Sequence, residues 1–467
     1  MNKYKVLREE NIKAKYGEGD SEISPFAVGI PLFEISDKCI EEIYYFRWRV
    51  YAKHIKKTPV GFVVTEFLPD VPWAGKYNTI SCPASHHFYE GRWLHEPKIL
   101  SDYAKFWLSD DAEPRKYSFP LADSVYKLMV IRGDYSLSEE LYSGLKKNYA
   151  EWEKSHLHSS GLFYQTDNRD GMELSISGNG LRPTINSYMY ADALAISKIA
   201  NLLGFSADEK LYKEKADTLK NLINDRLWDD NVNFYLNLSE ENGFEKAFVR
   251  ELIGYVPWCY SIPEGDRCSA WKFLFDKHFF DAPYGPCTAE RRHPKFMEKH
   301  SHECLWNGPS WPFATTQVLG AMIELFKNYS QDYVTPKDFY NLLLKYAKSQ
   351  YITENGKTVP FIDENLDPFT GRWLARDILM SKVPPRADRE RGKDYNHSAF
   401  ADLVIRGLCG IDLIDGKLTL NPLFDEEAVD YFCLDGVYIG GKYRTVIYDK
   451  DGTKYNRGKG LFLLDDI

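Results

Sequence analysis

The feature that most constrains the fold is a helical periodicity that recurs along most of the chain. The clearest case is the segment 183–203, where Ile185, Met189 and further apolar residues form one stripe. Pro183 suits the first helical position, and Gly204 follows as a stop signal. Nine further segments carry similar patterns: 37–57, 98–109, 119–131, 137–154, 207–226, 267–278, 310–327, 336–350 and 395–408.

This number of amphipathic helices in one body predicts an all-α fold built as a closed double ring of helices. A helical solenoid would also bury such faces, but the chain shows no repeat of fixed period. Residues 58–82 are rich in β-formers, Pro and Gly and predict short strands and loops between helices. We therefore expect an N-terminal extension over residues 1–35, a helical barrel over 36–410 and a small β-rich appendage over 411–467.

The composition excludes several kinds of partner. Lys plus Arg total 59 and Asp plus Glu total 68, a net charge of −9, whereas nucleic acids and anionic membranes require a basic surface. No run of about 18 apolar residues and no signal-peptide core is present, so we expect a soluble, cytoplasmic protein. Eight scattered cysteines form no C-x-x-C pair, and we expect them to be reduced. The oligomeric state stays open.

Aromatic residues make up 15% of the chain. Aromatic faces stack on the apolar C–H faces of sugars, and Tyr and Trp add a polar atom. The alternative, that these residues fill a large helical core, is favoured on composition alone. Particular motifs in the long loops, where functional residues usually lie, are therefore needed to indicate a function.

The first motif is an acidic loop over residues 165–175, just before the clearest helix. It contains Asp170, Glu173 and Arg169. A glycosidase needs one carboxyl group that stays protonated near neutral pH, and crowded like charges beside an apolar wall raise such a pKa. Apolar residues flank Glu173 on both sides. The alternative is a solvated acidic loop with Arg169 as an ion-pair partner.

The second motif is the segment 360–371, where Asp367-Pro368 marks a tight turn and holds Glu364 on a constrained stretch. A second carboxylate that faces the first across a sugar activates water or acts as a nucleophile. The alternative is a surface turn with incidental acids.

The third motif is the segment 305–312, which leads into a predicted helix. Trp306 and Trp311 offer stacking faces, and Asn307 offers an amide that hydrogen-bonds vicinal hydroxyls. The alternative is a helix N-terminus that Ser310 caps, with the Trp residues in the core.

Histidines raise the question of a metal. His86 and His87 lie near Glu90, and a second group spans residues 300–303. Neither has a third ligand at a recognised spacing, so we expect no metal and no cofactor. The stretch with His87 and Glu90 is polar and aromatic, which makes these two residues candidates for the sugar pocket. His397 precedes an apolar helix and is a further candidate, although its setting is typical of a capping or core histidine.

Taken in order, these motifs resemble those of the inverting (α/α)6-barrel glycosidases of the trehalase-like clan, which includes trehalases, glycoside hydrolase family 63 glucosidases and mannosylglycerate hydrolase-type domains. The matching stretches are 170–175 with 184–188, 306–311 and 364–371. The resemblance implies an (α/α)6 toroidal barrel, a general acid at Glu173 and a general base at Glu364. The clan usually has Asp where Glu173 stands, so Asp170 is the alternative acid.

The sequence thus predicts an exo-acting hydrolase that cleaves a short oligosaccharide or small glycoside with inversion. Trp306, Trp311, Asn307 and Arg169 would bind the sugar. In an inverting enzyme the two carboxyl groups lie roughly 6.5–9.5 Å apart. Two other functions remain open: a sugar isomerase or epimerase on the same barrel that uses histidines, and a carbohydrate-binding protein without turnover.

Overall fold

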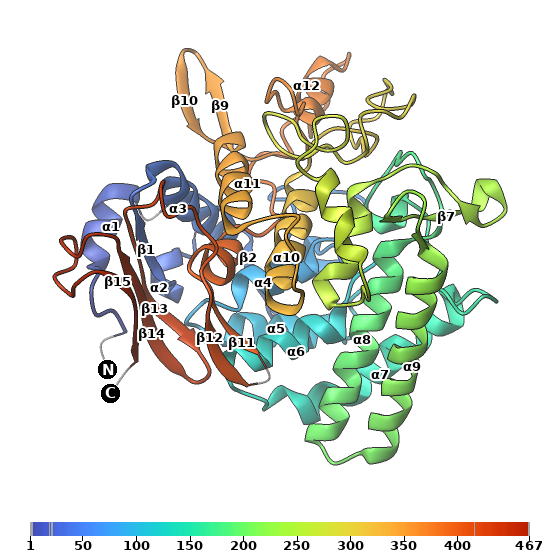
Figure 1. Ribbon diagram of the computed structural model, residues 1–467, viewed down its shortest axis with the longest axis horizontal. Coiled ribbons are helices and arrows are strands. Elements are labelled where there is room, and N and C mark those ends of the chain that lie inside the picture. Colours follow the sequence, from blue (N-terminus) through green and yellow to red (C-terminus); the bar gives the residue numbers. More distant parts are fainter. Residues whose placement is uncertain (1–2, 18, 20–21, 415, 466–467) are drawn as a thin grey trace.

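The computed structural model describes residues 3–17, 19, 22–414 and 416–465 (Figure 1). Helices are the most common regular structure in this part. The α-helices are α1 (Glu9–Tyr16), α2 (Pro25–Val28), α3 (Lys38–Lys53), α4 (Ala84–Gly91), α5 (Lys98–Trp107), α6 (Leu121–Arg132), α7 (Leu137–His156), α8 (Pro183–Leu202), α9 (Ser206–Leu222), α10 (Pro312–Asn328), α11 (Pro336–Ser349) and α12 (Leu374–Ser381).

Shorter 3-10 and π-helical segments join them. These are η1 (Lys76–Asn78), η2 (Asn168–Asp170), η3 (Ile223–Leu227), η4 (Glu240–Asn242), η5 (Leu252–Tyr260), η6 (Arg267–Phe273) and η7 (Leu403–Leu408).

Local signals in the sequence explain where several helices begin. Asp37 precedes α3, and its side chain accepts hydrogen bonds from two backbone N–H groups of the first turn. Thr335 and Asp338 form a capping box at the start of α11. Pro183 and Pro312 occupy first-turn positions of α8 and α10, where no N–H is needed. The helix predicted from residue 183 is confirmed as α8.

Other predicted helices differ from the expectation. The segment expected at 267–278 is only the 3-10 helix η6, followed by turns. The segment expected at 395–408 becomes helical only from residue 401, because residues 395–399 run as irregular chain. The unexpected helix η5 contains Pro257, which explains why helical periodicity did not reveal it.

The central helices follow one another in space. Contacts join α4 to α6, α6 to α8, α8 to η5, η5 to α10, and α10 to η7. Arg92, directly after α4, binds Asp402 before η7, with its Nη2 2.6 Å from the carboxylate and both side chains buried. The series of helices thus returns to its start. Outside it, α7 and α9 pack on α8, and α11 packs on α10 and α3 (Figure 1).

Strands accompany the helices, so the chain is mainly helical rather than all-α. They are β1 (Leu32–Ile35), β2 (Ile55–Thr58), β3 (Gly61–Val64), β4 (Gly180–Leu181), β5 (Trp228–Asp229), β6 (Phe234–Tyr235), β7 (Leu238–Ser239), β8 (Glu245–Lys246), β9 (Tyr351–Glu354), β10 (Lys357–Pro360), β11 (Ile411–Ile414), β12 (Lys417–Leu420), β13 (Tyr431–Ile439), β14 (Lys442–Asp449) and β15 (Gly460–Asp465).

The largest sheet is antiparallel, in the order β1-β13-β14-β15. Three of its strands belong to the expected β-rich segment 411–467, and β1 comes from the expected extension 1–35. Buried Asp435 on β13 accepts hydrogen bonds from the backbone of Lys5, Val6 and Leu7, which holds the start of the chain against the sheet. Residues 1–2, 18, 20–21, 415 and 466–467 lie outside the described residues. The two boundaries between segments stay predictions.

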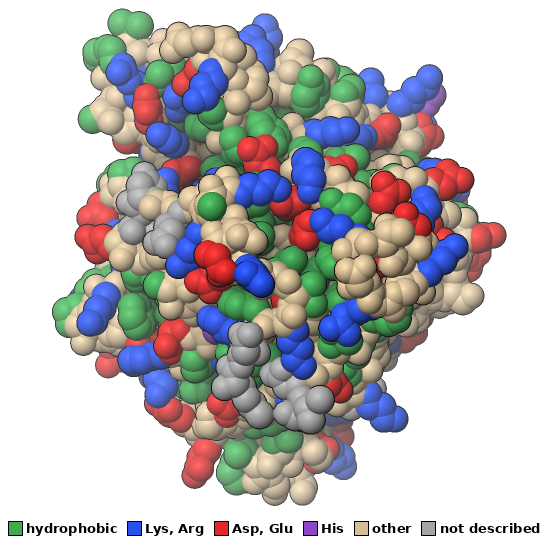
Figure 2. Space-filling view, turned by 90° about the vertical axis from the view of Figure 1, so that its left-hand side faces the viewer, with side chains coloured by type: hydrophobic (Ala, Val, Ile, Leu, Met, Phe, Trp, Pro, Cys, Tyr) green, Lys and Arg blue, Asp and Glu red, His purple; other side chains and the backbone are tan. Residues whose placement is uncertain are grey.

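The surface carries charges of both signs. Figure 2 shows the face on the left of Figure 1, where Lys and Arg side chains are interspersed with Asp and Glu. All eight cysteines are free thiols. None of the described helices has the length and hydropathy needed to cross a bilayer.

Candidate functional site

A cavity of about 310 Å³ lies at one end of the central helices. Its walls come from the loops that precede α4, α6, α8, α10 and the helix at 401–408, and from the loop between β10 and α12. Loops far apart in the sequence therefore meet where these helices begin. The lining residues are Glu66, Phe67, Trp73, Cys82, Tyr117, Asn168, Arg169, Gly171, Glu173, His302, Glu303, Cys304, Trp311, Glu364, Arg391 and Tyr395.

The loop that carries Glu173 is built around Asp167. The Asp167 carboxylate accepts hydrogen bonds from the backbone N–H groups of Asn168 and Leu174, at 2.6 and 3.1 Å. Gly171 has a left-handed backbone, and a Cβ there would lie 2.3 Å from the sulfur of Cys82. Leu174 also has a positive φ of 61°, a conformation that is costly for a residue with a side chain. Strained backbone thus lies directly beside Glu173.

Glu173 lies in a setting that favours its protonated form. Burial raises the pKa of Glu173 to about 8, and repulsion from the carboxylates of Glu364 and Asp167 adds to this. Arg169 opposes the shift. A carboxyl group with this pKa holds a proton at neutral pH and can donate it.

Glu364 faces the same cavity from another loop and is 1% exposed. Burial raises its pKa, while the guanidinium of Arg391 acts in the opposite direction. The Nε of Arg391 lies 3.6 Å from Glu364 Oε1, and the thiol of Cys304 donates a hydrogen bond to Oε2 at 3.2 Å. The neighbouring Asn365 donates to the carbonyl of Glu303 at 2.9 Å, which ties this loop to the one before α10.

Glu66 is a third carboxyl group in the cavity that the motifs did not single out. It follows β3, and the hydroxyl of Tyr395 donates a hydrogen bond to it at 2.5 Å. Burial, together with repulsion from Glu364 and Glu173, raises the pKa of Glu66 to about 8, against the opposing effect of the hydrogen bond from Tyr395. Its only signal in the sequence is its place in a polar and aromatic stretch. Cys304, Arg391 and Tyr395 were likewise not predicted.

Four of the predicted site residues line the cavity together: Glu173, Glu364, Arg169 and Trp311. Trp306 does not line it but stacks on Trp311, with ring centres 4.6 Å apart and planes 17° apart. The residue at the N-cap of α10 is Trp311 rather than Ser310.

The other candidates lie outside the cavity lining. Asp170 is fully buried and pairs with Arg182, whose Nε lies 2.7 Å away, and it also accepts a hydrogen bond from Thr184. Asn307 donates to the carbonyl of Glu298 at 2.8 Å.

Two histidine candidates also lie behind the cavity wall. Both ring nitrogens of His87 are hydrogen-bonded, to the hydroxyl of Tyr103 and the carbonyl of Asn396, and burial lowers its pKa to about 3. His397 is buried, with its ring centre 3.8 Å from that of Tyr395, which lines the cavity. Burial lowers the pKa of His397 well below its usual value.

Glu90 holds the start of the helix at 401–408. Its carboxylate accepts hydrogen bonds from the backbone N–H groups of Phe400, Ala401 and Asp402 at 2.9–3.1 Å, and all four residues are buried. The N-terminus of a helix needs such acceptors, because its first N–H groups have no partner inside the helix.

We therefore expect Glu90→Ala to lower the free energy of unfolding by about 3 kcal/mol, since it leaves buried N–H groups without an acceptor. Glu90→Gln keeps one side-chain oxygen and should lose less. Urea denaturation followed by circular dichroism measures both. Unchanged stability together with weakened sugar binding would instead assign Glu90 to the sugar.

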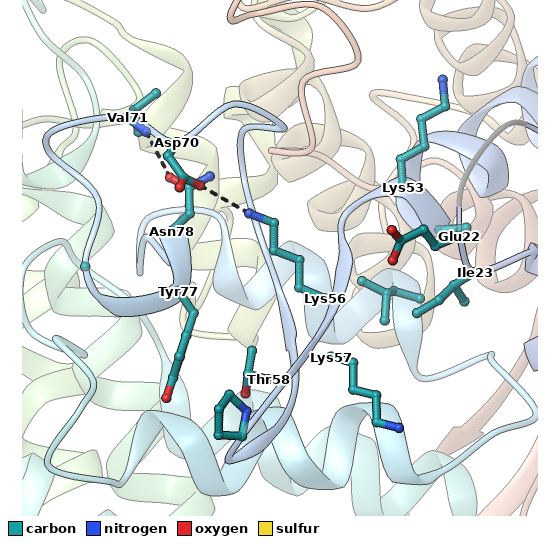
Figure 3. A pocket seen from close by; sticks show the side chains of 14 residues that line it. Glu22, Ile23, Lys53, Lys56, Lys57, Thr58, Asp70, Val71, Tyr77 and Asn78 are labelled. Carbon is teal, nitrogen blue, oxygen red and sulfur yellow. Dashed lines mark hydrogen bonds and ion pairs between the residues drawn. The ribbon is translucent and has the colours of Figure 1, made fainter.

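A larger hollow of about 650 Å³ lies beside β2 and β3 (Figure 3). Its acidic residues are Glu22 and Asp70, and Lys56 approaches Asp70 at 3.3 Å. The Asp70 side chain is 86% exposed, so it lacks the burial that makes a carboxyl group hold its proton. This hollow therefore lacks a pair of buried carboxyl groups. Among the described residues, no group of three or more His, Cys, Asp or Glu could hold a metal ion.

Comparison with known families agrees with this geometry. The family model of the mannosylglycerate hydrolase MGH1-like glycoside hydrolase domain matches residues 76–398, which include every cavity-lining residue except Glu66, Phe67 and Trp73. The fold and the site therefore define a glycoside hydrolase domain. The chain belongs to the MGH1-like glycoside hydrolase family, within the group that its motifs indicated.

Individual relatives extend this result. A solved structure named sialidase aligns with 99% of this chain at 37% identity and a TM-score of 0.91, and the match covers 44% of that chain. An uncharacterized protein from Borreliella burgdorferi is 28% identical over 192 residues, 40% of each chain. Each of these two matches thus covers less than half of the relative's length.

A more remote structure shares the fold. A mannosylglycerate hydrolase of family GH63 from Thermus thermophilus aligns with 77% of this chain and 98% of its own length, at 13% identity and a TM-score of 0.53.

Proposed function

We propose that this chain hydrolyses a glycosidic bond at the end of a short oligosaccharide or small glycoside, with inversion of the anomeric centre. The observation that carries the proposal is that Glu173 and Glu364, from two separate loops, line one cavity. The cavity volume of about 310 Å³ is at the small end of the usual range for ligand sites, which suits a terminal sugar residue.

In the proposed mechanism the two carboxyl groups have opposite tasks. Glu173, protonated at neutral pH, donates its proton to the glycosidic oxygen as the bond from this oxygen to the anomeric carbon breaks. Glu364, beside the positive charge of Arg391, accepts a proton from a water molecule. The oxygen of this water bonds to the anomeric carbon from the opposite face.

The contacts favour Glu173 over Asp170 as the acid. Asp170 faces Arg182 and Thr184 rather than the cavity, and both of these contacts are buried inside the protein. Asp170 therefore fits a role in holding the loop in shape.

The arrangement of helices supports an (α/α)6 barrel. The inner series runs from α4 through α6, α8, η5 and α10 to η7 and is closed by the pair of Arg92 and Asp402, while α7, α9 and α11 pack outside it. The cavity lies at the end where these inner helices begin, so the scaffold brings distant loops together.

The alternative isomerase would use histidines as acid and base. His86 and His87 are fully buried outside the cavity lining, and burial lowers the pKa of both to about 3. Neither imidazole meets the cavity, and the described part of the lining contains one histidine, His302, rather than a pair that could act as acid and base. This observation favours hydrolysis by carboxyl groups.

The stereochemistry of the first product tests the mechanism. Proton NMR during hydrolysis of an aryl glycoside should show the anomer opposite to that of the substrate before mutarotation mixes the two. A first product with the substrate's own anomeric configuration would establish retention and refute Glu364 as a base acting on water. Isomerised sugar without hydrolysis would establish the isomerase.

Arg391→Gln should move the acidic limb of the pH profile. Arg391 holds the pKa of Glu364 below the value that burial alone would cause, and Glu364 must be ionised to act. Loss of the guanidinium therefore raises the pKa of Glu364, and activity should decline at a higher pH as the solution is acidified. The profile of kcat/KM against pH measures this. A limb that stays in place would show that Glu364 is not the group that titrates there.

A further inference from the structure

The main cation inside the cavity is already engaged by acidic side chains. Arg391 is 3% exposed; its Nη2 lies 2.5 Å from Glu303 Oε1, and its Nε lies 3.6 Å from Glu364. Its Nη1 also pairs with Asp388 at 3.1 Å, and the guanidinium lies 5.1 Å from the ring centre of Trp73. An incoming carboxylate would have to displace Glu303 to form a two-point contact with this arginine.

The other arginine of the cavity lies at its opening. The Arg169 side chain is exposed, and its guanidinium lies 5.4 Å from the ring centre of Tyr117. A charge in contact with solvent attracts an anion less strongly than a buried charge does. Arg169 also favours the ionised form of Glu173, so pairing it with a substrate anion would change the proposed acid.

The carboxyl groups of the cavity oppose any further negative charge. Glu66, Glu173, Glu303 and Glu364 all line it, and three of them have a pKa raised by burial. Protonated Glu66 and Glu173 can donate hydrogen bonds, and Glu303, whose pKa is lowered by its hydrogen bond with Arg391, can accept them. Sugar hydroxyls both donate and accept hydrogen bonds and carry no charge, so they suit this mixture of donors and acceptors.

On the basis of the proposed glycosidase function, we propose that the site is selective for uncharged sugars, and that the pairing of Glu303 with Arg391 excludes sugars that carry a carboxylate. Glu303 is here a specificity-determining residue: it occupies the guanidinium that an acidic sugar would need. A preference for uncharged sugars differs from the acidic substrate that the name sialidase suggests for the 37% identical relative.

Matched substrates test the selectivity. A panel of 4-nitrophenyl pentosides and hexosides in both anomers identifies the sugar, and each accepted hexoside is compared with its 4-nitrophenyl uronide and with a 4-nitrophenyl sialoside. We expect kcat/KM for the neutral substrate to exceed that for the acidic ones at least a hundredfold. Equal or faster cleavage of a uronide or sialoside would overturn the inference.

A matched pair of variants tests the residue. Glu303→Gln should reduce the ratio of neutral to acidic kcat/KM at least tenfold, through a gain on the uronide. Asp388→Asn removes another carboxylate from the same arginine outside the cavity lining and should leave the ratio unchanged. An unchanged ratio in Glu303→Gln, or equal changes in both variants, would exclude Glu303 as the determinant.

Binding measured without turnover separates this inference from the proposed hydrolysis. Calorimetry of the intact chain with free neutral aldoses and with the matching uronic acids reports selectivity alone. Binding of neutral sugars with no cleavage of any substrate would refute hydrolysis and support the selectivity. Preferred binding of uronic acids, or binding of neither class, would overturn the selectivity.

Discussion

Glu364→Gln is expected to reduce kcat roughly a thousandfold while the protein stays folded, because general-base catalysis contributes on the order of 10²–10⁴ in rate. The amide has the shape of the carboxyl group but cannot accept the proton of the attacking water. Because Glu364 is 1% exposed and lies beside Arg391, the nearly isosteric amide is the substitution that disturbs the packing least. Initial rates on the best substrate of the panel, with a thermal melt for folding, measure the effect.

Asp367→Asn is the matched control. Asp367 lies three residues further along the same loop, where its carboxylate accepts hydrogen bonds from the backbone of Phe369 and Thr370. The amide oxygen can still accept them, and Asp367 does not line the cavity, so activity should persist. If Glu364→Gln retained full activity, Glu364 would be excluded as the base.

Glu173→Gln should produce a loss that depends on the leaving group. A poor leaving group, such as the hydroxyl oxygen of a second sugar, needs a proton as the bond breaks, so kcat/KM should drop roughly a thousandfold. A 2,4-dinitrophenolate leaves without a proton, so its kcat/KM should change little. The wild-type profile should decline as pH rises through about 8, where Glu173 loses its proton, and the variant should lack this limb.

Asp170→Asn separates the two candidate acids. Because Asp170 and Arg182 form a fully buried pair, breaking it should destabilise the protein by about 3–5 kcal/mol. The variant that stays folded should keep the wild-type ratio of kcat/KM between the substrates with the good and the poor leaving group. If Asp170→Asn rather than Glu173→Gln showed the dependence on leaving group, the acid would be Asp170.

The sequence alone was informative where the signal is local. The stripe of apolar residues after Pro183 predicted α8 almost to the residue, because one helix face must be buried. Motif order pointed to the family, and the separate loops that carry Glu173 and Glu364 line one cavity. Turn residues around Glu364 indicated a constrained segment, and Leu366 pairs there with Ser310.

Contacts between distant segments were not predictable in this way. Glu90 reads as a polar residue of an aromatic stretch, yet it accepts hydrogen bonds from a helix 310 residues further along the chain. Asn307 lies next to Trp306 in a motif that suggests sugar binding, but its amide donates a hydrogen bond to the carbonyl of Glu298. Glu66 enters the site because β3 ends beside Tyr395.

The sequence by itself therefore determined long helices such as α8, the family and the two loops that carry Glu173 and Glu364, because periodicity and short motifs are properties of neighbouring residues. Only the tertiary structure decided which carboxyl groups are buried together, that Asp170 pairs with Arg182, and that Arg391 is shared by Glu303 and Glu364. Burial and the distance between charges set the pKa of an acid, and both arise only when distant loops come together.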